Sequence, residues 1–431
     1  MSSQSSFVGR CGVVAAAAAL LVVGATAARA EAPNGVVGPD VVVFDIPSTY
    51  YWGTSGLTRA YSVGTTSCNR GDVPVEWVSS TNQHPVIAQN LYRVTLPDAG
   101  PPVEHGTIEM LGISWLKHGF VSVNGSSCDT CQYPPNGGAQ LGVGCSDPYS
   151  ASLNGSQSNL GPRSEVNAFT GYFLEPPGSP SGDPTLAGRI NVLASEIVND
   201  PSRYRYFVEG EYIAPDDALA GNGLNNASHR EVLVSGTSLT TTGATEEGRP
   251  AIYAWQDLDP TVTVREVQVP GEGLFIVAYT TGDNGNGTWH YEYNVFNLNS
   301  HLSGSSFSVP ILPDTVVTNT GFRDVSYHSG EPYDGTDWTV DLNPGLGWLT
   351  WYTDRYTVNP LANALRWGTM YTFRFDADDP PQPAYAAIGM YRDGGPPVVQ
   401  VMVDAPAGTV LPLFADDFES GTTDGWDAVV P

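Results

Sequence analysis

Lysine is almost absent from this 431-residue chain, in which Lys117 is the only lysine among 18 basic residues. Charged residues of both signs make up only 15% of the chain, while there are 48 glycines and 34 prolines. Coiled coils and most helical repeat proteins need charge-rich stretches with little glycine, so both classes are excluded. The charges are also unbalanced, with 45 acidic residues and a formal net charge of −27. Such a chain repels nucleic acid and anionic membrane surfaces, and neither is expected as a partner.

Motifs that identify common enzyme families are missing as well. The sequence contains no Gly-x-Ser-x-Gly nucleophile turn, no phosphate-binding P-loop, no His-Glu-x-x-His zinc motif and no dinucleotide fingerprint. These absences do not exclude an enzyme, but they favour a non-catalytic protein.

The one long apolar stretch lies near the N-terminus. Residues 12–27 are apolar, a polar segment with Arg10 precedes them, and Ala28-Arg29-Ala30 has the small-x-small pattern of a cleavage site. This predicts a secretory signal peptide over residues 1–30, cleaved after Ala30, because the apolar run is too short for a typical transmembrane anchor. We expect no membrane span in the mature chain, which should be secreted or displayed at the cell surface.

Four cysteines remain after this cleavage: Cys68, Cys128, Cys131 and Cys145. An even number in an exported chain predicts two disulfides, with three possible pairings. The alternative is a four-cysteine zinc site, since Cys128 and Cys131 have ligand spacing. A zinc ribbon usually repeats that pair, whereas Cys68 and Cys145 are single, so disulfides are favoured.

Alternation of apolar and polar residues predicts an all-β fold. Residues 203–212, 289–295 and 371–375 each place aromatic side chains on one face, and in 289–295 the other face carries His290, Glu292 and Asn294. Each segment is expected to be a half-buried strand with one face toward water. The only expected helix is a short turn at residues 216–220.

Turn-forming residues divide the chain into regions with different loop lengths. Residues 31–250 are predicted to form a loop-rich β domain with the disulfides, and its longest loop covers residues 124–165. Residues 251–405 contain about ten strand-like runs at the spacing of an immunoglobulin-like β-sandwich. Residues 406–431 form an acidic C-terminal tail, and the boundary between the two domains is expected near residues 246–260.

His84 and His118 are the leading candidates for metal ligands. A neutral imidazole is the commonest transition-metal ligand, and Asp147 or Glu165 could complete a site for zinc. The two histidines are far apart in sequence, so each could instead hydrogen-bond a loop carbonyl. Calcium has a separate candidate in residues 283–287, although an Asn-Gly hairpin turn explains that loop better. A divalent metal, calcium or zinc, is thus a possible cofactor.

A second group of residues could carry catalysis. Two cations could neutralise a substrate carboxylate while a histidine removes the neighbouring proton, as lyases that cleave uronic acids require. The residues with this chemistry are Lys117, His118, Arg163 and Glu165. Alternatively, Arg163 and Glu165 pair only with their neighbours.

Three adjacent aromatic residues, Tyr50, Tyr51 and Trp52, are the candidate for a sugar-stacking surface. Successive side chains of a strand point to opposite faces, so the three cannot all point inward. The alternative is a loop in which one ring fills the core.

Several segments resemble a group of exported bacterial proteins of unknown function. In the first half the segments are Gly64–Gly71, Asn82–Ile87, Ser114–Phe120, Gly144–Tyr149 and Leu160–Asn167. The end of the chain, Phe414–Trp426, is similar to the Phe-Glu-Ser-Gly…Trp tails of many exported bacterial proteins, which look like sorting or attachment signals. A disordered acidic end is the alternative. The resemblance implies export and a similar sandwich, but no activity and no catalytic residue.

The sequence therefore favours a secreted or cell-surface protein that binds a carbohydrate or an envelope component without catalysis. The alternative hypothesis is an exported enzyme, either a metal-dependent hydrolase or a polysaccharide lyase, with its site in the N-terminal domain.

Overall fold

The computed structural model describes residues 35–98, 104–326 and 331–406 of the chain. Strands account for 45% of the described residues and helices for 8%, and the sheets are antiparallel, which confirms the predicted all-β class. No helix within the described ranges is long and apolar enough to cross a membrane. The predicted signal peptide and the predicted tail beyond residue 406 lie outside the described residues.

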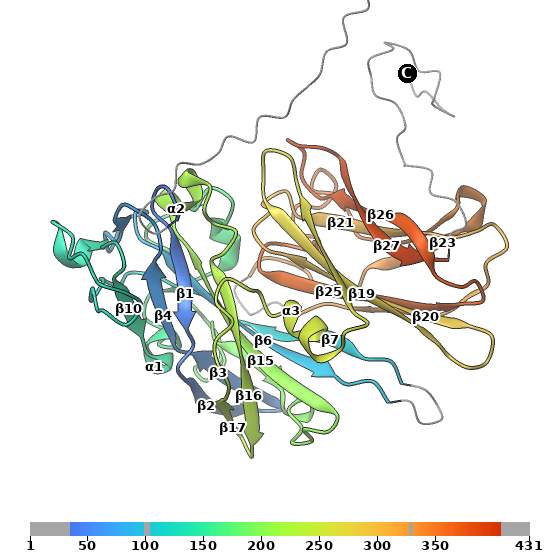
Figure 1. Ribbon diagram of the computed structural model, residues 1–431, viewed down its shortest axis with the longest axis horizontal. Coiled ribbons are helices and arrows are strands. Elements are labelled where there is room, and N and C mark those ends of the chain that lie inside the picture. The colour runs from blue at the N-terminus through green and yellow to red at the C-terminus, as the bar shows by residue number, and fades with distance from the viewer. Residues whose placement is uncertain (1–34, 99–103, 327–330, 407–431) are drawn as a thin grey trace, which may run out of the picture.

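A seven-stranded sheet organises the first half of the chain (Figure 1). Its strand order is β11-β8-β6-β15-β16-β17, and β7 pairs with β6 beside β8. The bounds are β6 Val86–Thr95, β7 Thr107–Ile113, β8 Leu116–Lys117, β11 Leu160–Gly161, β15 Tyr204–Ile213, β16 Ala227–Ser235 and β17 Ser238–Thr241.

Smaller sheets and short helices complete this half. Two three-stranded sheets are β1 Val41–Asp45, β4 Thr65–Asn69 and β10 Ser146–Tyr149, and β14 Ile190–Leu193, β3 Thr58–Val63 and β2 Thr49–Ser55. Two-stranded pairs are β5 Val75–Glu76 with β9 Gln140–Leu141, and β12 Val166–Asn167 with β13 Tyr172–Phe173. The helices are α1 Ala151–Asn154, α2 Pro215–Ala220 and α3 Tyr253–Leu258, with 3-10 turns at Gly137–Ala139, Arg163–Glu165, Ala194–Glu196 and Pro344–Leu346.

The second half contains two five-stranded sheets, which form a β-sandwich. The first sheet is β18 Thr263–Gln268, β19 Leu274–Asp283, β20 Trp289–Asn297, β25 Thr369–Ala377 and β22 Val317–Arg323. The second is β23 Thr339–Asn343, β24 Trp348–Tyr352, β21 Gly304–Pro310, β26 Gln382–Met390 and β27 Val398–Ala405. An immunoglobulin-like connectivity for this sandwich stays a prediction.

These elements test the predicted helix and the predicted hairpin turn. Helix α2 covers the expected turn, begins with Pro215 and ends at Ala220, and the following Gly221 has the left-handed φ of 78° that favours glycine. Helices α1 and α3 were not predicted, and α3 lies at the expected domain boundary with Trp255 buried. Residues 283–287 form the hairpin turn between β19 and β20, in which Asp283 accepts a hydrogen bond from the backbone of Gly285 (2.7 Å).

The cysteines form two disulfides, Cys68–Cys128 and Cys131–Cys145, which confirms the prediction of disulfides and gives their pairing. The alternative four-cysteine zinc site therefore does not form. Both bridges fasten the segment between β8 and β11, because Cys128, Cys131 and Cys145 belong to it while Cys68 lies on β4. The predicted loop at residues 124–165 is thus interrupted by β9, β10, α1 and β11. Closing such loops covalently restricts the unfolded chain and so stabilises the native one.

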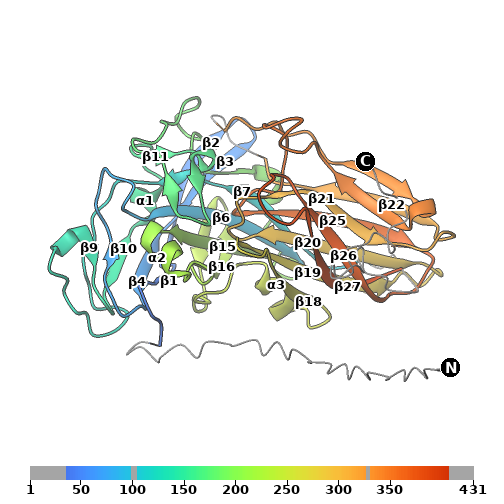
Figure 2. The same ribbon diagram turned by 90° about the horizontal axis from the view of Figure 1, so that it is seen from above.

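One hydrophobic core passes without interruption from the first half into the second. It includes Tyr92 and Ile108 from the seven-stranded sheet, Trp255 from α3, and Phe275 and Phe373 from the sandwich. Strand β7 contacts β20 and β25, and both views show it extending from the first half toward them (Figures 1 and 2). A second core lies within the first half, between the seven-stranded sheet and the smaller sheets.

This packing corrects the prediction that β15, β20 and β25 each face water on one side. Glu292 is only 2% exposed and Asn294 is fully buried, although both lie on the polar face of β20. For β20 and β25 the reason is that β7 covers this face of their sheet. Strand β15 belongs to the same sheet as β7, and on its polar face Glu209 and Glu211 are buried.

His290, expected on a water-facing surface, is instead largely enclosed where the two halves meet. Its Nδ1 lies 2.8 Å from Asp376 and its Nε2 3.2 Å from Glu292. His105, from the connection between β6 and β7, stacks on it with ring centroids 4.6 Å apart. Burial alone would lower the pKa of His290, but hydrogen bonds and attraction from Glu292 and Asp376 outweigh it and raise that pKa. Burial lowers the pKa of His105, so of the two stacked rings the one that carries a charge is that of His290.

We predict that His290 stabilises the fold more at pH 6 than at pH 9. A raised folded-state pKa contributes stability that is present below the unfolded value near 6.5 and is lost as pH rises through the folded value. His290→Gln should cost about 2 kcal/mol at pH 6 and progressively less toward pH 9. Denaturant titrations of both proteins across this range would measure the difference.

His301→Gln is the matched control. Burial, with repulsion from Arg392 and Arg366, lowers the pKa of His301 to about 4. The stability cost of His301→Gln should therefore rise with increasing pH, whereas that of His290→Gln falls. Parallel slopes for the two variants would contradict the assignment of His290 as a charged partner.

Candidate functional site

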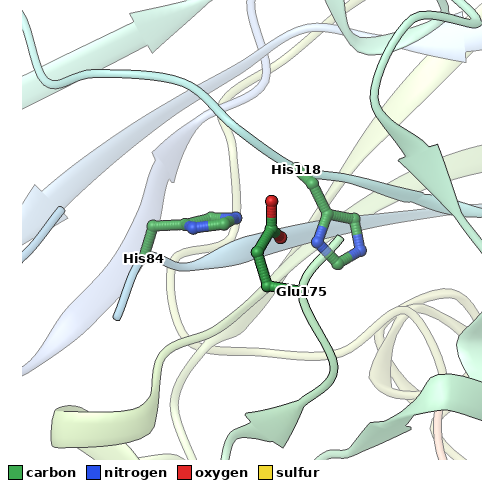
Figure 3. A group of neighbouring side chains, drawn as sticks. All are labelled: His84, His118 and Glu175. Atoms are coloured by element: carbon green, nitrogen blue, oxygen red, sulfur yellow. The ribbon is translucent and has the colours of Figure 1, made fainter. Parts of the chain in front are cut away.

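His84, His118 and Glu175 come from three separate segments and meet in the first half of the molecule (Figure 3). His84 lies shortly before β6, His118 directly follows β8, and Glu175 follows β13. Strand pairing places two of them, because Ile87 of β6 pairs with Lys117 of β8. The structure thus brings together the two histidines that the sequence identified.

The three side chains each offer one ligand atom, and these atoms all lie within 4.8 Å of one another. Figure 3 shows the carboxylate of Glu175 between the two imidazoles. His84 is fully buried and His118 is 2% exposed, whereas Glu175 is partly exposed. This donor set, two imidazoles and one carboxylate, is typical of sites that bind transition metals.

Hydrogen bonds leave most of this cluster unsatisfied. Both ring nitrogens of His118 and Oε2 of Glu175 are buried without a partner. Nε2 of His84 accepts a hydrogen bond from the backbone N–H of Gly119 (3.1 Å). Burial lowers the pKa of His118 to about 3, with smaller contributions from His84 and Lys117, so its imidazole is neutral at physiological pH. A neutral imidazole keeps the lone pair that a metal needs.

Aromatic side chains enclose the cluster. The ring of Phe173 lies 5.1 Å from both imidazole rings, and Phe120 lies 6.2 Å from His84. On the other side Gly161 leaves room for His118, since a Cβ there would meet Nε2 at 2.9 Å. The surroundings are therefore apolar and closely packed.

The carboxylates predicted to join the histidines lie elsewhere. Asp147 is fully buried in β10, where one oxygen accepts a hydrogen bond from the backbone of Val123 (2.8 Å) and burial raises its pKa to about 7. Glu165 accepts a hydrogen bond from the backbone of Gly178 (2.9 Å). Glu175, which does join the cluster, was missed because its irregular segment has no spacing relation to either histidine.

Lys117, one of the predicted catalytic residues, is turned toward the backbone. Its ammonium donates hydrogen bonds to the carbonyls of Ser156 (3.3 Å) and Ser158 (2.5 Å). Burial lowers its pKa to about 8. These contacts hold the loop that precedes β11.

Arg163, the predicted partner of Lys117, is buried between the two halves and is 4% exposed. Its guanidinium donates to the carbonyls of Ser114 (2.7 Å), Gln89 (3.2 Å) and Gly368 (3.0 Å). It also donates to the side chain of Asn90 (2.7 Å). All three guanidinium nitrogens thus have partners within the protein, and Gly368 belongs to the second half. The positions of Lys117, Arg163 and Glu165 therefore suggest support of the fold more than contact with a substrate.

We predict that Arg163→Lys destabilises the protein by about 3–5 kcal/mol, because an ammonium cannot reach acceptors on both halves and leaves buried carbonyls unpaired. Denaturant unfolding measures this cost. Arg265→Lys, at an exposed position, is the control and should change the unfolding free energy by less than about 0.5 kcal/mol. A negligible effect of Arg163→Lys would show that this residue does not join the two halves.

The predicted sugar-stacking residues divide between two environments. Tyr50 is 46% exposed and meets Trp52 edge to face, with centroids 4.8 Å apart. Arg189 covers one face of Trp52 at 3.6 Å. Tyr51 contacts Tyr61 and hydrogen-bonds Thr54. Only Tyr50 offers a well-exposed ring, so the three do not form a flat platform.

A groove of about 660 Å³ lies where the two halves meet, and sequence reasoning did not find it. Its walls come from β3, β7, β14 and the segment 182–186 in the first half, and from β22 and the residues after it in the second. The polar side chains that line it are Thr58, Asp183, Asn191, Glu196, Arg323, Asp324 and Ser326, and the apolar ones are Met110, Leu111, Leu186 and Leu193.

Acidic groups dominate this groove. Among the described residues that line it, Arg323 is the one cationic side chain, and it is paired with Glu196 and Glu109. Asp324 accepts a hydrogen bond from Asn363 (2.5 Å), and burial raises its pKa to about 6. The groove therefore has a carboxyl that changes charge close to neutral pH.

No model of a known protein family matches the chain, and the comparison with curated proteins finds no relative.

Proposed function

We propose that this is an exported protein that binds a carbohydrate in the groove between its two halves. The observation that supports the proposal is the groove itself, because its volume falls in the range of small-ligand sites and it lies at the junction of the two halves. Sugars present both hydroxyl groups and apolar C–H faces. The walls offer carboxylates and an amide that can hydrogen-bond the hydroxyl groups. Leu186, Leu193 and Met110 can pack against the apolar faces.

The charge of the groove narrows the ligand class. Asp183, Glu196 and Asp324 face a single arginine, which is already paired, so a polyuronate would be repelled. A neutral oligosaccharide or one with amino sugars fits this charge better. A lyase that cleaves uronic acids in this groove is correspondingly disfavoured.

We predict that Asp324→Asn weakens binding of an amino-sugar oligosaccharide about tenfold and changes binding of a neutral one much less. The asparagine keeps an oxygen for the hydrogen bond from Asn363 but removes the charge that attracts an ammonium group. Isothermal titration of the mature chain, residues 31–431, measures both affinities after a glycan array has identified the ligands.

Asp341→Asn, on the exposed surface of β23, is the matched control and should bind as the unchanged protein does. Affinity for the amino sugar should also rise between pH 5 and pH 7, as Asp324 loses its proton, and Asp324→Asn should abolish that rise. The proposal fails if the mature protein binds no polysaccharide or envelope fraction, or if Asp324→Asn binds every ligand normally.

A second candidate function, an exported glycoside hydrolase, is favoured by one observation. Asp324 can hold a proton near neutral pH, as a general acid must, and Glu196 provides a second carboxylate in the same groove. Incubating the array ligands with the protein and assaying new reducing ends separates the two functions. Product that Asp324→Asn fails to form supports the hydrolase, and intact ligand supports binding alone.

A further inference from the structure

We propose that His84, His118 and Glu175 bind a divalent ion of the zinc class, independently of the groove. The three ligand atoms lie within 4.8 Å of one another, whereas tetrahedral zinc with bonds near 2.0 Å places its ligands about 3.3 Å apart. Glu175 is partly exposed and is the least constrained of the three, so rotation of its side chain can close this gap.

The unsatisfied polar atoms are the strongest argument for an ion. A buried polar atom without a hydrogen bond costs roughly 1–3 kcal/mol, and native proteins contain few of them. Here Nδ1 and Nε2 of His118 and Oε2 of Glu175 all lack partners. A cation bound between the three side chains would satisfy one nitrogen of His118 and Oε2 of Glu175 at once, and it would balance the carboxylate.

The donor chemistry selects the metal. Two imidazole nitrogens and one carboxylate suit zinc and its transition-metal neighbours, while calcium requires six to eight oxygen ligands. The closely packed rings of Phe173 and Phe120 also disfavour magnesium, which retains several bound waters.

The position of the cluster indicates a structural role. The ion would join three loops that come before β6, after β8 and after β13, and the pairing of β12 with β13 includes only two residues on each strand. None of the three ligands lines the groove between the two halves. Metal binding should therefore order the loop that carries Glu175, and its failure would leave the carbohydrate proposal intact.

Metal analysis of the mature protein, purified without a histidine tag and with its disulfides formed, tests the site. After removal of metals with a chelator, dialysis against Zn²⁺ should restore one ion per chain. Glu175→Gln should lower the affinity for Zn²⁺ about tenfold or more, and His118→Gln should abolish uptake. Zn²⁺ should raise the melting temperature of the unchanged protein, while Ca²⁺ should not.

Glu165→Gln is the matched control, because Glu165 lies near this loop but only hydrogen-bonds Gly178. It should take up Zn²⁺ normally. Since His118 is buried and its replacement could prevent folding, the partly exposed Glu175 provides the decisive variant. Absence of bound Zn²⁺ in the unchanged protein, or equal affinity and equal thermal stabilisation in Glu175→Gln, would overturn the assignment.

Discussion

The guanidinium of Arg163 joins the two halves of the molecule by buried hydrogen bonds, beside the hydrophobic core that the halves share. It donates to carbonyls at Gln89 and Ser114 in the first half and at Gly368 in the second, from a position that excludes water. Burying a cation is costly unless its donors are satisfied and opposite charge is near. Glu331 contributes that charge, whereas burial raises the pKa of Glu211 to about 8 and leaves that carboxyl mostly neutral at physiological pH. The groove follows from this junction because its walls come from both halves.

The strands could be predicted from the sequence, but their surroundings could not. Tyr291, Tyr293 and Val295 alternate with polar residues, and this period of two correctly indicated a strand. The same pattern indicated one face toward water, whereas Glu292 is buried against the first half. Alternation reports which side chains share a face, but it contains no information about a second layer contributed by a distant part of the chain.

In the candidate sites, too, the chemistry of single residues could be predicted from the sequence, but their positions relative to one another could not. His84 and His118 could be selected because few side chains bind transition metals, and cysteine number and export together predicted the disulfides. Glu175 could not be selected, because acidic residues are common here and only the fold places this one beside the imidazoles. The groove could not be predicted either, since Asp324 is distant in sequence from Asp183 and Glu196 and shares their environment only when the halves meet.

One irregular segment, residues 160–193, connects all of these features. It provides Arg163 to the junction, Glu175 to the histidine cluster, and Asp183, Leu186 and Asn191 to the groove. Little of it pairs in sheets, so side-chain contacts must fix its position. An ion held by Glu175 would restrain this segment at a point that lies, along the sequence, between Arg163 and the residues of the groove. The order of this segment would then depend on buried polar contacts together with the apolar side chains of Val166, Ala168 and Phe173, which pack in a small core with Leu116 and Trp367.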